Sequence, residues 1–328
     1  MNSQFFTTIM RSSCAAVVHS VAMPSTVFAE TYPSRAIRLV VGFAPGTGPD
    51  ILARTLGQEL STQLGQPVVV ENRDGAGGRI AAQFVAKSPS DGYTVLIADV
   101  SAISIAPAAF SKLGYDPARE LVPVSEVART DFVLVVPNSS GSNSAATFVD
   151  AAKKQDKINF GTFGAGTPGH FGAEMFASQE KFRIEPIHYR ATGDAVSAII
   201  SGDVNAAFVS TALASAQVKG GKLRALATTA PQRSTLLPDV PTFNEAGYPK
   251  ADFSAWFSLF VPAGTAKPVI SALNAAAVKS MDSAAAKKKL EEAGFSVVGS
   301  SIADTQSMVI AETERWRKVV AATGFKGD

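Results

Sequence analysis

The chain has 328 residues, of which 46% are hydrophobic and 18% are charged, and its formal net charge is +2. This composition is typical of a folded protein large enough for two domains, and it excludes a disordered chain. Lysine and arginine are scattered along the sequence, which argues against a nucleic-acid surface. Beyond the first 29 residues, no apolar run reaches the ~20 residues of a membrane helix.

Residues 1–29 have the pattern of a signal peptide. An apolar run over 14–23 leads to Val27 and Ala29, which are spaced like a signal-peptidase site. A disordered N-terminal extension is the alternative. A signal peptide would direct the protein to the periplasm, and its cleavage near Ala29 would remove Cys14, the only cysteine. The mature chain would then hold no cysteine nucleophile, thiolate zinc site or disulfide.

A strand, a glycine loop and a helix form the first unit of the mature chain. Residues 37–43 form a mostly apolar strand, Gly46 and Gly48 follow, and Pro49 suits the first turn of a helix. Such a loop favours an anion, because a helix N-terminus carries unpaired N–H groups and a positive dipole end. A plain strand-to-helix turn is the alternative. Asp50 in the first helical turn is stabilised by the helix dipole, which is a sufficient structural reason for an acid there. If Asp50 has a functional role, we expect it to fix the loop, to order water or to bind an amino group of the ligand.

Two further strands, 67–73 and 94–100, flank a helix over 79–87. Short apolar strands that alternate with helices indicate βαβ units and a parallel sheet. Ligands of such sheets bind beyond the carboxyl ends of the strands. We therefore expect Gly46, Gly75 and Ser101 to line one crevice.

The alternation begins again after a β-rich segment over 122–137 and a polar break over 138–144. We expect helices over 145–154, 170–180 and 194–201 with a short one ending at 219, and strands over 158–163, 184–190, 206–210 and 223–229. A second glycine loop, 164–169, lies between a strand and a helix. After a strand over 253–261 the chain is helical over 268–281, 283–292 and 302–322, too poor in strands for a third core.

These patterns predict two doubly wound α/β domains with a ligand cleft between them, joined by two crossover segments as a closing clamp. Residues 1–29 form the signal peptide, 30–128 with 255–328 form domain 1, and 129–254 form domain 2.

Two other classes of function remain open. Residues 164–169 match G-x-G-x-x-G and so allow a nucleotide-binding protein, but Glu185 begins its strand, at the wrong end to reach a ribose. A periplasmic hydrolase would use His170, although no G-x-S-x-G motif is present. His170 is more simply a hydrogen-bonding group of the helix N-terminus or a ligand contact, and we expect His188 in the core. We expect no enzyme activity, metal or cofactor.

Several separated motifs in this order resemble the Bug family, the extracytoplasmic solute receptors of tripartite tricarboxylate transporters. They are Phe43-Ala-Pro-Gly with Asp50, Glu71-Asn-Arg-Asp-Gly-Ala-Gly-Gly78, Ala86-Lys with Asp91-Gly-Tyr93, Gly166-Thr-Pro-Gly-His170 with Glu174, and Leu237-Pro-Asp-Val-Pro-Thr-Phe-Asn-Glu-Ala-Gly-Tyr248. The resemblance implies a periplasmic receptor that closes over a small carboxylate, held largely by backbone groups and waters of the two loops. The implied ligand-binding residues are Phe43, Ala44, Pro45, Gly46, Asp50, Gly161, Thr162, Gly166, Thr167 and Pro168.

The ligand class stays open between mono- and dicarboxylic acids, amino acids and aromatic carboxylates, because Arg190, Asn205 and Ser210 depart from the family pattern. We expect a monomer that hands its carboxylate to membrane transporter subunits or a sensor domain, without nucleic acid.

Neither glycine loop contains Lys or Arg, so backbone N–H groups and two helix N-termini should hold the carboxylate, helped by hydroxyls of Thr162, Thr167 and Ser101. Arg190, Ser210 and His170 complete the candidate ligand-binding set, with Arg190 tuning the distal end. We expect Gly166→Val to block ligand approach with little harm to either core.

Overall fold

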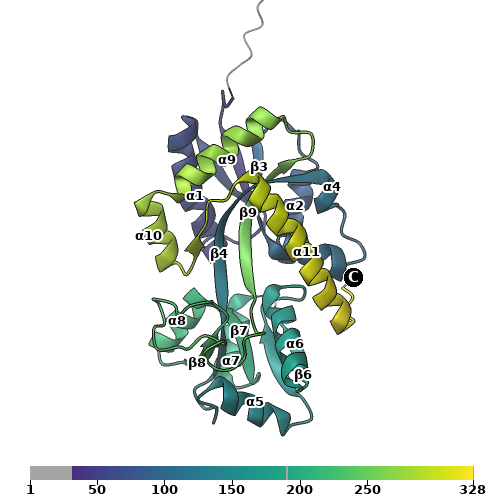
Figure 1. The fold of residues 1–328 in the computed structure, drawn as a ribbon, viewed down its shortest axis with the longest axis vertical. Coiled ribbons are helices and arrows are strands. Elements are labelled where there is room, and N and C mark those ends of the chain that lie inside the picture. Colours follow the sequence, from purple (N-terminus) through teal and green to yellow (C-terminus); the bar gives the residue numbers. More distant parts are fainter. Residues whose placement is uncertain (1–31, 190, 328) are drawn as a thin grey trace, which may run out of the picture. The chain divides into compact units, whose positions relative to one another are not determined.

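A computed structural model describes residues 32–189 and 191–327 (Figure 1). The proposed signal peptide and Arg190 lie outside these residues. The strands are β1 (Ile37–Val41), β2 (Val68–Asn72), β3 (Thr94–Asp99), β4 (Leu121–Pro137), β5 (Ile158–Thr162), β6 (Ile184–His188), β7 (Ala206–Ser210), β8 (Leu223–Thr228), β9 (Ser254–Pro262) and β10 (Ser296–Val297).

The helices are α1 (Gly48–Leu64), α2 (Arg79–Ala86), α3 (Ala106–Ala109), α4 (Pro117–Glu120), α5 (Ala145–Lys153), α6 (Pro168–Glu180), α7 (Thr192–Ser201), α8 (Thr211–Lys219), α9 (Lys267–Met281), α10 (Ala284–Glu292) and α11 (Ile302–Thr323). A 3₁₀ turn (Ala76–Gly78) precedes α2 and a π-helical turn (Ser101–Ile105) precedes α3.

Two sets of parallel strands are joined through one long strand. β1 pairs in parallel with β2 and β3, and β5 pairs in parallel with β6 and β7. The first part of β4, up to Asp131, pairs with β9, and the part from Phe132 pairs with β7 and β8. Figure 1 shows β4 running from one set of elements to the other. The strand β4 therefore changes its partners between Asp131 and Phe132. The predicted α/β class is confirmed.

The parallel pairing expected for the first three strands is confirmed, whereas two long strands run against their neighbours. β9 is antiparallel to both β3 and β4, and β4 is antiparallel to β7, β8 and β10. Both directions suit a strand that is buried on its two faces, so the apolar runs of β4 and β9 did not reveal theirs.

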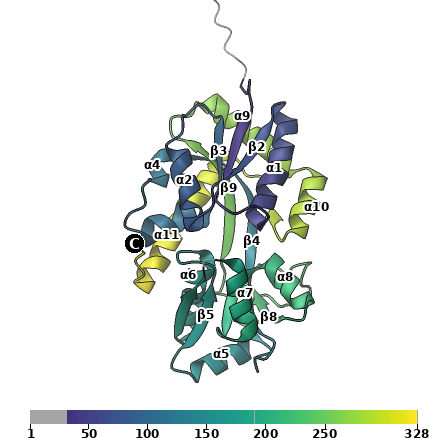
Figure 2. The ribbon, with the colours of Figure 1, turned by 180° about the vertical axis from the view of Figure 1, so that it is seen from behind.

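Apolar strand faces and helix stripes form the core. Leu39 of β1 and Leu52 of α1 are fully buried, and burial of such a side chain stabilises by about 1.5–3 kcal/mol. The C-terminal helices pack back on earlier elements, α9 and α10 against α1, and α9 and α11 against β4. Seen from behind, α1 and α10 lie together on one side of β1–β3 and α2 lies on the other (Figure 2). The domain limits near residues 129 and 255 stay a prediction.

No helix within the described ranges is long and apolar enough to cross a membrane.

Candidate functional site

The first glycine loop is latched by a buried carboxylate. Asp50, 3% exposed in the first turn of α1, accepts hydrogen bonds from the Gly46 N–H at 2.9 Å, from Arg54 Nε at 2.9 Å and from Asn72 Nδ2 at 2.7 Å. Asn72 Nδ2 also donates to the Phe43 carbonyl oxygen at 2.9 Å. Burial alone would raise the pKa of Asp50, but these hydrogen bonds outweigh it and hold the pKa below its ordinary value. Asp50 therefore fixes the loop as an anion whose charge Arg54 balances.

The second glycine loop is latched by a histidine. His170, 2% exposed in the first turn of α6, accepts the Gly166 N–H at Nδ1 over 3.3 Å. An Nδ1 that accepts carries no proton, so this ring is neutral with its proton on Nε2. Burial, and then the nearby ring of His188 at 4.6 Å, lowers the pKa of His170 to about 4. The expectation that His170 is a hydrogen-bonding group of the helix N-terminus is confirmed.

The two loops, 43–50 and 163–170, have Phe, Gly and Thr at equivalent positions and similar hydrogen bonds. Gly46 and Gly166 both have a φ of +81°, which favours glycine. The hydroxyl of Thr47 donates to the Ala44 carbonyl oxygen at 2.7 Å, and that of Thr167 donates to the Gly164 carbonyl oxygen at 2.9 Å. An acid in the first loop and a neutral imidazole in the second accept the equivalent N–H.

This design leaves both helix N-termini open. Thr47 and Thr167 are the N-cap residues of α1 and α6, and neither side chain caps its helix. The first backbone N–H groups of a helix have no partner four residues earlier, which suits an uncapped N-terminus to a carboxylate. Pro49 and Pro168 supply no N–H, and the His170 N–H donates to the Thr167 carbonyl oxygen at 3.1 Å. The candidate donors are therefore the N–H groups of Gly48 and Asp50 in α1 and of Gly169 in α6. The second loop suits an anion better, since its latch carries no negative charge.

The expected hydroxyl donors already have partners within the protein. Ser101 Oγ donates to Asp99 Oδ2 at 2.7 Å, and Thr162 Oγ1 lies 2.7 Å from His188 Nδ1. Thr167 donates to Gly164 as described. A carboxylate needs hydrogen-bond donors, and the protons of these hydroxyls have acceptors within the protein. Backbone N–H groups are therefore the better donors for a carboxylate in this structure. His188 itself is exposed, so its expected core position is wrong, although its ring has a partner.

The other candidates have local tasks. Gly161 is buried in β5, where an added Cβ atom would lie 3.0 Å from Val204 Cγ2, and Ser210 accepts the Leu213 N–H at 3.5 Å as the N-cap of α8. Pro168 is buried in the first turn of α6, whereas Pro45 is exposed and Ala44 half-buried. The structure thus gathers the loop residues around Asp50 and His170, and leaves Gly161 and Ser210 in packing and capping roles.

An aromatic cluster beside the second loop was missed from the sequence. The Phe110 ring lies under the Arg79 guanidinium, 3.4 Å from its carbon to the ring centroid, and an added Cβ atom on Gly166 would lie 2.8 Å from Phe110 Cε2. Phe325, after α11, lies 5.1 Å from the His170 ring and 6.2 Å from the Phe110 ring, centroid to centroid. Contrary to the expectation from sequence, we therefore predict that Gly166→Val destabilises the loop, because the valine side chain would meet Phe110 and would be strained at a φ of +81°.

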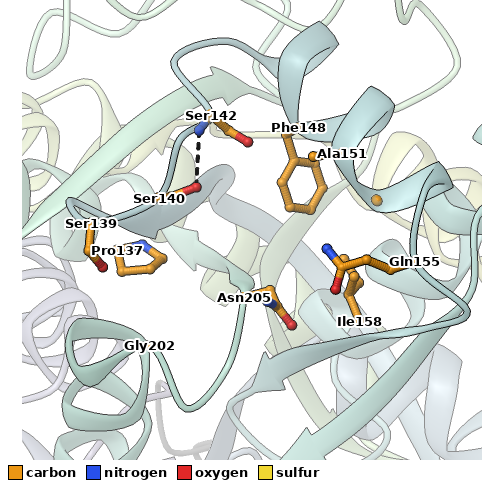
Figure 3. Close-up of a pocket in the computed structure, with 11 residues that line it drawn as sticks. Pro137, Ser139, Ser140, Ser142, Phe148, Ala151, Gln155, Ile158, Gly202 and Asn205 are labelled. Atoms are coloured by element: carbon orange, nitrogen blue, oxygen red, sulfur yellow. Dashed lines mark hydrogen bonds between the residues drawn. The ribbon is translucent and has the colours of Figure 1, made fainter.

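A cavity of about 240 Å³ lies away from the glycine loops (Figure 3). Pro137 at the end of β4, Ile158 at the start of β5 and Asn205 before β7 border it, with Gln155 opposite Asn205. These positions mark the amino ends of β5 and β7, whereas the second loop follows the carboxyl end of β5. The cavity is therefore separate from the candidate site. Among the described residues no group of three or more His, Cys, Asp or Glu side chains could hold a metal ion.

Comparison with known proteins points to one family. A family model described as a tripartite tricarboxylate transporter family receptor matches residues 52–325. The protein BugT of Bordetella pertussis is 34% identical over 311 residues, which cover 94% of this chain and 95% of BugT.

Two solved structures are similar throughout. Rpa4515 of R. palustris, with adipate, is 32% identical with a TM-score of 0.82, over 90% of this chain and 99% of that chain. MatC of Rhodopseudomonas palustris, with bound malate, is 30% identical with a TM-score of 0.78, over 88% of this chain and 100% of that chain.

Proposed function

Because the chain belongs to the tripartite tricarboxylate transporter receptor family, we propose that it captures a small carboxylate between its two glycine loops and delivers it to a membrane transporter or sensor. The resemblance of the sequence motifs to the Bug family is confirmed. Members of the family are solute-binding receptors rather than enzymes.

The matched latches of the two loops carry this proposal. Asp50 and His170 each hold the N–H of the preceding loop glycine, Gly46 or Gly166. With those two amides occupied, the N–H groups of Gly48 and Asp50 in α1 and of Gly169 in α6 remain to donate to a ligand. Each helix end contributes only ~0.3–1 kcal/mol where it is exposed, and more where it is partly buried. Tight binding then requires both loops to meet the same carboxylate and expel water.

The ligand class is proposed from the neighbours and the loops together. Adipate and malate, the ligands of the two solved relatives, are both dicarboxylates. We therefore place dicarboxylates of four to six carbons first among the candidates. The first carboxylate would meet the glycine loops, and the Arg190 guanidinium is the candidate partner of the second. The two lobes, 30–128 with 255–328 and 129–254, would close around it.

The cellular setting belongs to the same proposal. Residues 1–29 would direct export and be removed near Ala29, and the mature receptor would work in the periplasm as a monomer. Expression of the full chain in a bacterial host with a periplasm, followed by N-terminal sequencing, tests the cleavage site.

A thermal-shift screen of the exported protein against carboxylates tests the function. A ligand at ~100 times its dissociation constant stabilises the native state by about 2.7 kcal/mol, which raises Tm by several degrees. We expect such a shift for a dicarboxylate without turnover. Hydrolysis of an ester or amide that is abolished by His170→Ala would favour the hydrolase instead, and a shift with NAD or ATP alone would favour nucleotide binding.

A matched pair of glycine variants tests the loop itself. Gly46 and Gly65, which follows α1, both have positive φ and no neighbour within 4 Å of an added Cβ atom. Gly46→Val should abolish the carboxylate-induced shift because the side chain occupies the approach to the α1 N-terminus. Gly65→Val carries a similar backbone strain far from the loop and should keep the shift. Equal shifts in both variants would contradict the proposed site.

A further inference from the structure

One buried carboxyl group next to the first loop has an unused oxygen. Every residue of β3 is buried, and the strand ends at Asp99, which is 5% exposed. Oδ2 accepts the Ser101 hydroxyl at 2.7 Å. Oδ1 is buried and, within the described part of the chain, has no hydrogen-bond partner.

This oxygen lies near Phe43, the residue that begins the first glycine loop. An added Cβ atom on Gly78 would lie 3.8 Å from Asp99 Oδ1 and 4.0 Å from the Phe43 ring at Cε2. Phe43 begins the first glycine loop, so the free oxygen and that loop border the same glycine. Gly75, Ala76, Gly77 and Gly78 all have positive φ. Because three of these four residues are glycines, the turn next to Asp99 carries no side chain other than the methyl group of Ala76.

Among residues 32–189 and 191–327, no cation forms an ion pair with Asp99. The nearby Arg79 stacks on Phe110 and donates from Nε to the Ala76 carbonyl oxygen at 2.7 Å. Tyr115, the ionisable group that interacts with Asp99 electrostatically, donates its hydroxyl to the Ala102 carbonyl oxygen at 2.6 Å. Burial raises the pKa of Asp99, while hydrogen bonds from the Ser101 hydroxyl and nearby backbone amides partly oppose this effect, and the resulting pKa is about 6. The carboxyl group is thus largely ionised at neutral pH and lacks a donor on one oxygen.

A buried carboxylate oxygen without a partner is costly, and a ligand that supplies a donor removes that cost. We propose that Asp99 Oδ1 accepts a hydrogen bond from a donor group on the ligand, either an ammonium or a hydroxyl, so that the receptor selects an amino- or hydroxydicarboxylate over the unsubstituted acid. This inference rests on the proposed carboxylate-binding function and adds the group that distinguishes between carboxylates. The alternative is that Asp99 only holds the turn at Ser101.

Matched ligands separate these roles. Isothermal titration of the exported protein with succinate, malate and aspartate compares no donor, a hydroxyl and an ammonium on one carbon chain; adipate, 2-hydroxyadipate and 2-aminoadipate repeat the comparison at six carbons. We expect a substituted acid to bind at least tenfold more tightly than its parent acid in one series.

Two variants then identify the donor. Asp99→Asn keeps the shape and one acceptor oxygen but loses the charge, and Asp99→Ala loses both oxygens. A preference for ammonium should fall at least tenfold in both variants, whereas a preference for hydroxyl should fall only in Asp99→Ala. Affinity for the unsubstituted acid should be retained or increased, because both variants remove a negative charge near a dianionic ligand. Asp116→Asn, at an exposed cap of α4, is the control and should leave all ratios unchanged.

Each remaining outcome is decisive. Equal or tighter binding of the unsubstituted acids by the wild-type protein overturns the role of Asp99, while the carboxylate receptor stands. A preference that survives Asp99→Ala also overturns it, and circular dichroism with the succinate or adipate affinity shows that this variant is folded. Failure of every carboxylate to bind overturns the proposed function and this inference with it.

Discussion

Gly166 and Gly46 offer a matched test of how the second loop is held. Both glycines have a φ of +81°, so alanine imposes the same backbone strain, about 1–2 kcal/mol, at each position. Alanine also restricts the unfolded chain, which returns about 0.4–1 kcal/mol. The two positions differ in space, because an added Cβ atom on Gly46 has no neighbour within 4 Å, whereas on Gly166 it lies 2.8 Å from Phe110.

Gly166→Ala should therefore destabilise more than Gly46→Ala. Overpacking against an aromatic ring adds about 1–3 kcal/mol. We expect a net loss of about 1 kcal/mol for Gly46→Ala and about 2–4 kcal/mol for Gly166→Ala in the free energy of unfolding. Urea denaturation of the ligand-free protein, followed by circular dichroism, measures both values.

Phe110→Leu identifies the cause through a double-mutant cycle. Leucine is smaller than the ring, so the extra loss in Gly166→Ala should shrink by at least about 0.5 kcal/mol in the Phe110→Leu background. The same background should leave the effect of Gly46→Ala unchanged. Equal losses for the two glycine variants, or no coupling to Phe110, would refute the argument that Phe110 packs on the second loop.

Three more predictions follow from the charges around the loops. Asp50→Asn should lower the free energy of unfolding by about 1–3 kcal/mol at pH 7, since it weakens charge-assisted bonds to Gly46 and Arg54. Because the pKa of Asp50 is lowered in the folded state, this difference should disappear as the pH falls below about 4, so that the urea curves of wild type and variant converge. The pKa of Asp99 is raised in the folded state, so its effect on stability runs the other way. The free energy of unfolding of the wild type should fall by up to about 3 kcal/mol relative to Asp99→Asn as the pH rises from 4 through about 6. Identical pH profiles of the two proteins in urea denaturation would contradict this. Arg190→Ala should change the ranking of carboxylates in titration calorimetry without abolishing all binding, and complete loss in a folded variant would mean that an arginine holds the primary carboxylate.

The loops could be predicted from the sequence because their chemistry is local. Gly46 and Gly166 mark backbone that turns with positive φ, and Pro49 and Pro168 mark the first turns of α1 and α6. The parallel strands β1–β3 and β5–β7 followed from the spacing of apolar runs and helices.

The remaining features depend on contacts between distant residues. The direction of β9 is set by its position between β3 and β4, which no local pattern records. Phe110 meets Gly166 and Phe325 only after the chain has folded back, so the cluster left no motif. Asp99 did leave a signal, an acid at the end of an otherwise apolar strand, but its importance depends on burial that only the structure shows.

The crystal structure of the receptor with its tightest carboxylate tests the central claim most directly. The account predicts that the oxygens of one carboxylate accept hydrogen bonds from backbone N–H groups at the N-termini of both α1 and α6, directly or through single waters. A carboxylate held instead by the Arg190 guanidinium, by one loop alone, or in the cavity beside Gln155 and Asn205 would contradict it.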